Sequence, residues 1–194
     1  MKIAVDMDEV MVHMLPALKK HYKTVNKKPC PIQPNYDYNY SKIFKIPPRE
    51  AQWLVYSFWN SEESHNLKPV KNAERVLRNL KKQGNKLTVV TGRQLYATLA
   101  TECTINKHFH GIFDDIIYIN SYSLIGPEMT KLEVCEKIKA DYLIDDSISQ
   151  IQSLEHSDTI PVLFKGNPQY QWTYELPGVL QFNDWNKIEK FFLA

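Results

Sequence analysis

Short apolar runs alternate with longer amphipathic stretches along most of the chain. Runs typical of buried strands lie at residues 2–5, 86–90, 115–119, 142–144 and 160–164. Apolar residues at helical spacing predict helices at residues 10–25, 48–59, 73–83, 94–106, 131–139, 148–154 and 185–193. Strands that alternate with helices are typical of a parallel sheet covered by helices on both faces. The pattern therefore predicts an α/β fold with a Rossmann-like parallel-sheet core.

One segment interrupts this alternation. Residues 26–48 contain five prolines and a tyrosine at every second position over 36–40, a composition typical of loop. We expect residues 14–70 to form a small, mainly helical cap inserted after the first strand. Residues 1–13 and 71–194 would then form the core.

Composition and charge narrow the class of protein. Of the 194 residues, 43% are hydrophobic and 24% are charged, as in a globular chain. The formal net charge of +2 is too small for a general binder of nucleic acid or anionic membranes, and no apolar run approaches the roughly 20 residues of a membrane helix. Three separated cysteines and an N-terminal segment rich in carboxylates favour a cytoplasmic protein. We expect neither a membrane nor a nucleic-acid partner, and a homodimer stays open.

Reactive side chains follow the ends of three predicted strands. Asp6 and Asp8 follow the first strand, Thr91 ends the second, and Asp145 with Asp146 follows the fourth. Because ligands bind outside the carboxyl ends of the strands in open parallel sheets, these side chains should share one crevice.

This set of residues suits the hydrolysis of a phosphate monoester. The carboxylate of Asp6 can attack phosphorus, since the acyl phosphate that forms is itself easily hydrolysed. Asp8, two residues later, can protonate the leaving alcohol and then deprotonate water. The proposed chemistry is that of a phosphatase that forms an aspartyl-phosphate intermediate.

The charge of a phosphate dianion also has to be neutralised. Mg²⁺ takes one or two carboxylates together with substrate oxygens, and Asp6 and Asp146 can supply those carboxylates. Lys131, at the start of a predicted helix, adds a positive charge. Thr91 and the following amide, that of Gly92, can donate hydrogen bonds to a phosphate oxygen.

Four segments resemble motifs I to IV of the haloacid dehalogenase superfamily, in the required order. They are IAVDMDEV at 3–10, LTVVT at 87–91, Lys131 and YLIDD at 142–146. The DMDEV sequence, the insertion that follows it, and PVLF at 161–164 with Asn-Pro behind it are similar to the 5′(3′)-deoxyribonucleotidase-like branch. The resemblance covers residues 1–13 and about 70–165.

The resemblance implies a hydrolase of nucleoside monophosphates that depends on Mg²⁺. Asp6 would be the nucleophile and a metal ligand, and Asp8 the acid/base and a metal ligand through its backbone carbonyl. Asp146 would contact the metal directly, with Asp145 supporting it from behind. Thr91 and Lys131 would hold the phosphate.

Two residues depart from the family pattern. Glu9 occupies a position where the wider superfamily prefers glycine, although the deoxyribonucleotidase-like branch often tolerates glutamate. His13 stands where that branch usually has aspartate, at the start of the cap hinge, so the departure bears on substrate choice.

Other functions stay open. One alternative is a phosphatase of this superfamily acting on a sugar phosphate or on a phosphorylated nucleic-acid end. Another is a non-catalytic binding protein with the same fold, which the retained acidic residues disfavour. A phosphate-accepting receiver domain is excluded by the order of the motifs, because an acidic pair comes last here.

Several side chains near the motifs allow two interpretations. Arg93 either contacts the phosphate or lies on the surface of the following helix. Four aromatic residues of the predicted cap either line a slot for a nucleobase or, as their helical spacing favours, form the core of the cap: Trp53, Tyr56, Phe58 and Trp59.

Overall fold

The computed structural model describes residues 1–31, 39–123 and 126–193. A six-stranded sheet forms the centre, and all of its neighbouring strands are parallel, in the order β5-β4-β1-β6-β7-β8. The strands are β1 (Lys2–Val5), β4 (Lys86–Thr91), β5 (Asp115–Tyr118), β6 (Tyr142–Asp145), β7 (Ile160–Phe164) and β8 (Leu180–Phe182). The predicted α/β class is confirmed.

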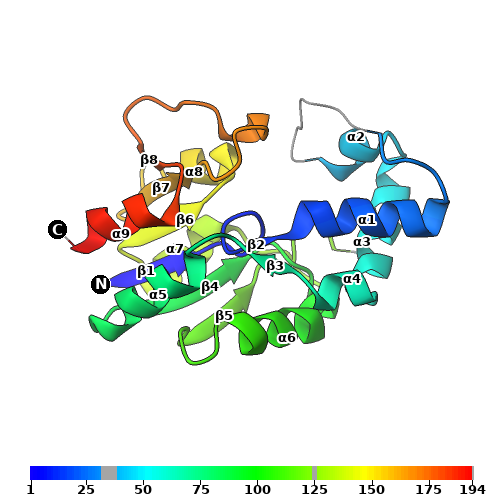
Figure 1. Cartoon of the computed structure of the whole chain (residues 1–194). Helices are drawn as coiled ribbons and strands as arrows, with labels where there is room; N and C mark the ends of the chain where they lie inside the picture. Colours follow the sequence, from blue (N-terminus) through cyan, green and yellow to red (C-terminus); the bar gives the residue numbers. More distant parts are fainter. Residues whose placement is uncertain (32–38, 124–125, 194) are drawn as a thin grey trace.

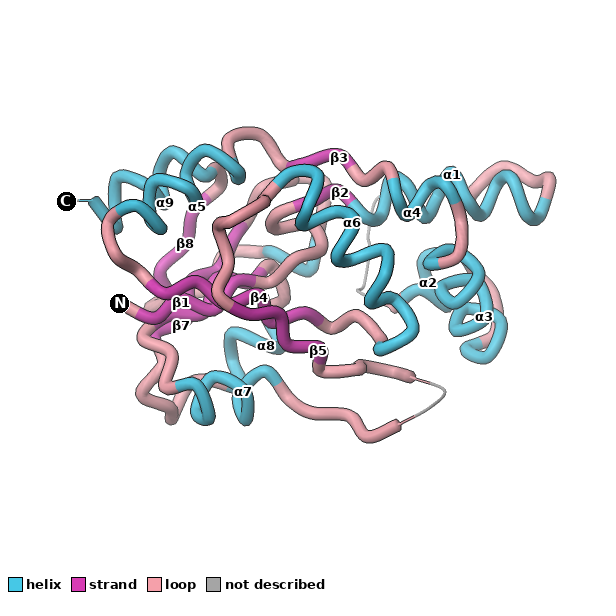
Figure 2. Tube along the Cα trace, turned by 90° about the horizontal axis from the view of Figure 1, so that it is seen from below, coloured by secondary structure: helices cyan, strands magenta, loops and turns pink. Residues whose placement is uncertain are grey.

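Helices cover both faces of the sheet. Figure 2 shows α5, α6 and α9 on one face and α7 and α8 on the other. Their bounds are α5 (Ala73–Lys82), α6 (Thr98–His108), α7 (Lys131–Ile138), α8 (Ile148–Ser153) and α9 (Trp185–Leu193). Successive side chains of β1 point to opposite faces of the sheet. Ile3 and Val5 belong to the apolar cluster on one face, and Ala4 belongs to the cluster on the other.

The described part of residues 14–65 forms four helices, which make a second group beyond the carboxyl end of the sheet (Figure 1). We call them the helical insertion, residues 14–65: α1 (Met14–Asn26), α2 (Tyr40–Phe44), α3 (Pro48–Trp59) and α4 (Glu62–His65). The chain enters and leaves the insertion through β2 (Val12–His13) and β3 (Lys68–Pro69), which pair antiparallel. The two segments that connect the insertion to the rest of the chain therefore lie side by side.

The spacing of apolar residues predicted the wrong start for the first helix. We predicted a helix from residue 10, but α1 begins at Met14. Val10 is fully buried at a position that fits the helical stripe, yet it lies in a turn, and the next residues pair with β3 instead. The predicted face is otherwise present, since Met14, Leu18 and Tyr22 are all buried.

The predicted loop at 26–48 contains α2. Asn39 caps this helix, because its side chain accepts hydrogen bonds from the amides of Ser41 and Lys42. Ile43 and Phe44 then bury the apolar face of the short helix. Tyr36 and Tyr38 lie outside the described residues.

Short elements were missed for lack of a pattern. β8 has three half-buried residues and shows no alternation that could predict a strand. The 3-10 turn η2 (Gln171–Thr173) was missed as well. Residues 95–97, predicted as part of the helix at 94–106, form the 3-10 turn η1 (Leu95–Ala97) before α6.

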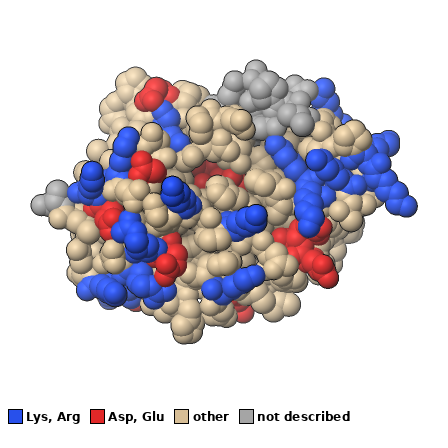
Figure 3. Space-filling model, in the orientation of Figure 1, with Lys and Arg blue, Asp and Glu red and all other residues tan. Residues whose placement is uncertain are grey.

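None of the helices in the described part of the chain has the length and apolar content that a membrane crossing needs. Figure 3 shows Lys and Arg side chains gathered over α1. The residues Lys20, Lys23, Lys27 and Lys28 are exposed in and just after this helix.

Candidate active site

Three buried carboxylates meet at the carboxyl ends of β1 and β6. Asp6 follows β1 and Asp145 ends β6, and the amide of Asp6 donates to the carbonyl of Ile144 at 2.9 Å. The strands are neighbours in the sheet, so their ends place these side chains together. With Asp146, they each offer an oxygen within 4.8 Å of the others.

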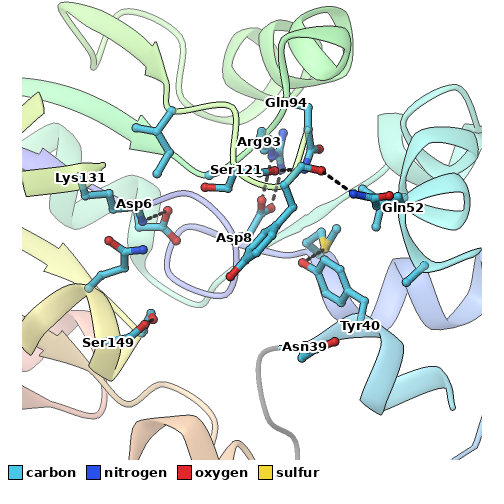
Figure 4. A pocket seen from close by; sticks show the side chains of 18 of the residues that line it. Asp6, Asp8, Asn39, Tyr40, Gln52, Arg93, Gln94, Ser121, Lys131 and Ser149 are labelled. Carbon is cyan, nitrogen blue, oxygen red and sulfur yellow. Dashed lines mark hydrogen bonds and ion pairs between the residues drawn. The ribbon is translucent and has the colours of Figure 1, made fainter. Parts of the chain in front are cut away.

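Lys131 joins this cluster from the first position of α7. A capping box fixes the start of the helix: Thr130 Oγ1 accepts from the Glu133 amide at 3.1 Å, and Glu133 Oε2 accepts from the Thr130 amide at 2.7 Å. Lys131 Nζ lies 2.5 Å from Asp6 Oδ1 and 2.5 Å from Asp145 Oδ2. Figure 4 shows it reaching Asp6 across the floor of a cavity.

Burial shapes the protonation of the cluster. Burial raises the pKa of Asp6 to about 7, against the opposing effect of the Lys131 ammonium and with help from the charge of Asp145. Burial and the neighbouring carboxylates Asp145 and Asp6 also raise the pKa of Asp146 well above its ordinary value. Burial alone would lower the pKa of Lys131, but Asp145 and Asp6 outweigh it and raise that pKa. The cluster has more carboxylates than one ammonium can neutralise.

The hydrogen bonds separate the two aspartates of the acidic pair. Asp145 is fully engaged, since Oδ2 accepts from Lys131 and Oδ1 accepts from the Ser147 amide at 2.8 Å. Asp146 Oδ2 accepts from Trp172 Nε1 at 2.7 Å. Its Oδ1 is buried and has no hydrogen-bond partner among the described residues. A buried, unpaired carboxylate oxygen beside Asp6 fits a divalent cation such as Mg²⁺, which takes oxygen ligands.

Arg93 holds Asp8 in a two-point contact. Arg93 Nη2 lies 2.7 Å from Asp8 Oδ1, and Nε lies 3.0 Å from Oδ2 (Figure 4). Arg93 is only 2% exposed. The interpretation of Arg93 as a surface residue is therefore wrong, and the side chain contacts the predicted acid/base.

Thr91 and Gly92 follow one another at the end of β4. Gly92 lines the cavity, whereas Thr91 is fully buried and is not among its lining residues. The Thr91 hydroxyl accepts from the amide of Arg93 at 3.3 Å. Its side chain thus shapes the turn that leads to Gly92 and Arg93.

Glu9 has a left-handed backbone, with φ of 63°. This conformation favours glycine, which accounts for the residue that the superfamily prefers there. Glu9 Oε1 accepts from the Leu15 amide at 2.6 Å, in the first turn of α1, and Oε2 accepts from the Tyr170 hydroxyl at 2.7 Å. His13, the other departure, places Nδ1 3.7 Å from Glu9 Oε2.

A cavity of about 450 Å³ lies between the carboxylates and the helical insertion. Six of the seven predicted site residues line it, all except Thr91: Asp6, Asp8, Gly92, Lys131, Asp145 and Asp146. Neutral polar side chains line much of the rest of the cavity, including Asn39, Gln52, Gln94, Ser121, Ser149 and Gln150. Among the described lining residues, Lys131 and Arg93 are the cations, and both are paired with carboxylates.

The predicted aromatic residues of the insertion do not share one role. Trp59 lines the cavity, and Phe58 is fully buried. Trp53 and Tyr56 are 50% and 40% exposed. Tyr40 also lines the cavity, and its hydroxyl donates to Met14 Sδ at 3.5 Å. Trp59 and Tyr40 are the aromatic side chains of the insertion that line the cavity within the described ranges.

Sequence reasoning missed Tyr170 and Trp172. Their rings stack with centroids 4.3 Å apart in the segment between β7 and β8, and each donates to a carboxylate near the site. They lie in a stretch without helical or strand periodicity, and their partners are distant in the sequence. Their aromatic character in a loop was the available signal.

Comparisons with known proteins identify the fold. No protein-family model matches the chain, and no curated protein matches it. Among solved structures, a hydrolase of the haloacid dehalogenase-like family from Streptococcus pneumoniae is similar, with 12% identity, a TM-score of 0.69 and coverage of 98% of this chain and 97% of the other. A protein from Clostridium acetobutylicum described as a predicted phosphatase has 16% identity, a TM-score of 0.68 and coverage of 99% and 97%.

A third similar structure is described as a predicted phosphoglycolate phosphatase from Haemophilus somnus. It has 18% identity, a TM-score of 0.59 and coverage of 98% of this chain and 96% of the other. Because the shared architecture extends over almost the whole of each chain, the protein has the haloacid dehalogenase-like fold.

Proposed function

We propose that the protein is a phosphomonoester hydrolase that uses Asp6 as its nucleophile. The observation that carries the proposal is the meeting of Asp6, Lys131 and the unpaired Oδ1 of Asp146 at the floor of one cavity. A nucleophilic carboxylate, an ammonium group and a free carboxylate oxygen are what the transfer of a phosphoryl group requires. The haloacid dehalogenase-like fold agrees with this chemistry, although a fold alone does not decide function.

The residues would hold Mg²⁺ through Asp6 and Asp146, with Asp145 orienting its neighbours. The hydrogen bonds support this division, because both oxygens of Asp145 are occupied and one oxygen of Asp146 is free. When bound, Mg²⁺ neutralises part of the negative charge that the phosphoryl group and the carboxylates bring together.

The reaction proceeds in two steps. An oxygen of Asp6 attacks phosphorus, the bond to the leaving oxygen breaks, and Asp8 gives a proton to the departing alcohol. Water then attacks the aspartyl-phosphate, Asp8 takes its proton, and inorganic phosphate leaves with Asp6 restored. Lys131 and the Gly92 amide bind the phosphoryl oxygens in both steps.

The leaving group would be neutral and rich in hydrogen-bonding groups, as in a nucleoside monophosphate. The helical insertion covers the phosphate site as a cap and offers amide and hydroxyl side chains, together with the ring of Trp59. Such groups bind a sugar or a base by hydrogen bonds and stacking. The resemblance of the DMDEV segment to the deoxyribonucleotidase-like branch supports the same class.

Phosphoglycolate suits this cavity less well, although two of the similar structures are described as phosphoglycolate phosphatases. Its leaving group, glycolate, bears a carboxylate, which requires a cation that is not already engaged. Lys131 and Arg93, the cations among the described lining residues, are paired with Asp6, Asp145 and Asp8. A second carboxylate would instead meet the negative charge of the site.

A phosphorylated nucleic-acid end is a second candidate substrate. The exposed lysines over α1 favour it, because a basic stripe attracts the phosphate backbone (Figure 3). Hydrolysis of such an end would weaken steeply with added salt, whereas hydrolysis of a mononucleotide would depend on salt much less.

The test is phosphate release in the presence of Mg²⁺ from nucleoside 5′- and 3′-monophosphates, sugar phosphates, phosphoglycolate and phosphorylated oligonucleotides. We expect some nucleoside monophosphates to exceed the other compounds tenfold or more in kcat/KM, about 1.4 kcal/mol of discrimination. Asp6→Asn should abolish all activity. Activity confined to sugar phosphates would keep the catalytic assignment and overturn the nucleotidase assignment, while activity retained by Asp6→Asn would overturn both.

A further inference from the structure

The guanidinium of Arg93 is oriented from several sides inside the protein. Nε and Nη2 each donate to one oxygen of Asp8, and Nη1 donates to Thr101 Oγ1 at 3.0 Å. Thr101 is itself fixed, since its hydroxyl donates to the carbonyl of Ala97 at 2.9 Å. The side chains of Arg93 and Asp8 are 1% and 11% exposed. This arrangement holds the plane of the Asp8 carboxylate through two parallel hydrogen bonds.

The helical insertion completes this arrangement. Trp59, the last residue of α3, places its ring 4.4 Å from the guanidinium carbon of Arg93, a cation–π contact. The indole Nε1 donates to Gln94 Oε1 at 3.2 Å, and Gln94 Nε2 donates to the Ser121 carbonyl at 2.7 Å. The end of α3 is thus attached to the same turn that carries Arg93.

We propose that Arg93 is a positioning residue that aims Asp8 at the leaving oxygen, and that Trp59 ties this alignment to the helical insertion. The inference rests on the proposed phosphatase function and adds to it how the acid/base is held. Proton transfer requires the donor within hydrogen-bond reach of the leaving oxygen, so a carboxyl free to rotate loses much of its effect. A Trp59 ring seated on Arg93 means that Asp8 is aligned when the insertion covers the cavity.

A positioning role for Arg93 can be distinguished from a merely structural one by comparing two substrates, one whose leaving group needs a proton and one whose leaving group does not. p-Nitrophenolate departs without protonation, whereas an alcohol needs the proton that Asp8 supplies. The test compares kcat/KM for p-nitrophenyl phosphate and for the best alkyl phosphate of the panel, because kcat/KM reports the steps up to the first phosphoryl transfer. Arg93→Met should lose about 100-fold on the alkyl phosphate and less than about threefold on p-nitrophenyl phosphate.

A second variant guards against misfolding. Arg93→Lys keeps a cation beside Asp8 but loses the two-point contact, so we expect the same selective loss at about 10-fold. Thermal unfolding of both variants confirms that they are folded. Equal losses on the two phosphates in the folded variants would overturn the proposal.

The Asp8→Asn background provides a further readout. Because Arg93 acts through Asp8, Arg93→Met should change kcat/KM for the alkyl phosphate less than about twofold once Asp8 is replaced. Losses that multiply in the double variant would show that Arg93 acts elsewhere, and would overturn the proposal.

The link to the insertion is tested with a pair of tryptophan variants on the same helix. Trp59→Leu should lower the alkyl-to-aryl ratio of kcat/KM about fivefold. Trp53→Leu, at a position that is 50% exposed, should leave the ratio unchanged. An unchanged ratio in Trp59→Leu would overturn the link.

The proposed function and this inference fail in distinguishable ways. Wild-type protein that hydrolyses neither phosphate would overturn the proposed function and the inference with it. Active wild-type protein with no leaving-group selectivity in the variants would overturn the inference alone.

Discussion

Trp172 Nε1 donates to Oδ2 of Asp146 at 2.7 Å, while Oδ1 of the same carboxylate has no hydrogen-bond partner within the described ranges. The bond restricts the rotation of the Asp146 carboxylate, which is one of the three carboxylates that gather at this site. Trp172 therefore orients the expected metal ligand although it is not among the residues that line the cavity of about 450 Å³.

Trp172→Phe keeps an aromatic ring and removes the indole N–H that donates to Asp146. We expect the Mg²⁺ concentration for half-maximal activity to rise about 10-fold or more, because partners that orient metal ligands affect metal affinity by this amount. The measurement is a Mg²⁺ titration of p-nitrophenyl phosphate hydrolysis. Trp53→Phe, on the exposed face of α3, is the matched control and should titrate as the wild type. An unchanged titration of Trp172→Phe would contradict an orienting role.

Gln52→Lys tests the neutral character of the cavity wall. Gln52 lines the cavity from α3, and its weak contact with the Tyr122 carbonyl, at 3.5 Å, leaves it replaceable. A cation there should raise kcat/KM for phosphoglycolate relative to a nucleoside monophosphate about 10-fold, since a carboxylate then finds a partner. Gln52→Met removes the amide without adding charge and should not produce this change. A lysine variant with wild-type preference would argue that the leaving group binds elsewhere.

Two substitutions of Glu9 separate the contribution of its hydrogen bonds to the free energy of unfolding from the contribution of its left-handed backbone. Both Glu9→Ala and Glu9→Gly leave the Leu15 amide and the Tyr170 hydroxyl without their acceptor, at a cost of about 2–4 kcal/mol in the free energy of unfolding. Alanine retains the unfavourable left-handed conformation at φ of 63°, so Glu9→Ala should be about 1 kcal/mol less stable than Glu9→Gly. Urea denaturation measures both values. The reverse order would show that this backbone conformation carries no strain.

The contribution of Glu189 to the free energy of unfolding should depend on pH. Hydrogen bonds from Asn79 and Arg75 hold the pKa of Glu189 below its ordinary value of 4.5 and tie α9 to α5. A lowered pKa contributes stability above the ordinary value, and this contribution is lost as the pH falls through the pKa of the folded state. Glu189→Gln should therefore lower the free energy of unfolding by about 1 kcal/mol at pH 7.

The deficit of Glu189→Gln should shrink as the pH falls below 4.5. The measurement is thermal unfolding at pH 7 and at a pH below 4.5. Glu102→Gln, at an exposed position on α6, serves as the control. A deficit of equal size at both pH values would show that charge plays no part.

The positions of the acidic residues followed from the sequence. Asp6 and Asp145 come at the ends of apolar runs that were predicted as parallel strands, and parallel strands end at the same edge of a sheet. The helix that carries Lys131 was recognisable from its own spacing. Where the position of a side chain depended on the end of a strand, the sequence was sufficient to predict that position.

The contacts around these residues could not be predicted from the sequence in the same way. An arginine before a helix usually lies at the surface, and the burial of Arg93 depends on Asp8 and Trp59, both distant in the chain. Tyr170 and Trp172 belong to a segment without periodicity. Local patterns report which elements form, whereas these contacts arise from how separate elements meet.

The N-terminal segment gains its partners late in synthesis. β1 lies between β4 and β6, Glu9 accepts from Tyr170, and the carbonyl of Val10 accepts from Trp185 Nε1 at 2.9 Å. At about 5–20 residues per second, the ribosome needs on the order of 10 s to reach Trp185 after it has made Asp6. The sheet neighbours of β1, which are β4 and β6, are made earlier, but during this interval the segment with Asp6 and Asp8 lacks the contacts of Tyr170 and Trp185. A chain that stalls before Tyr170 would therefore leave Glu9 and Val10 without these two contacts, and would expose the segment that follows β1 to chaperones or proteases.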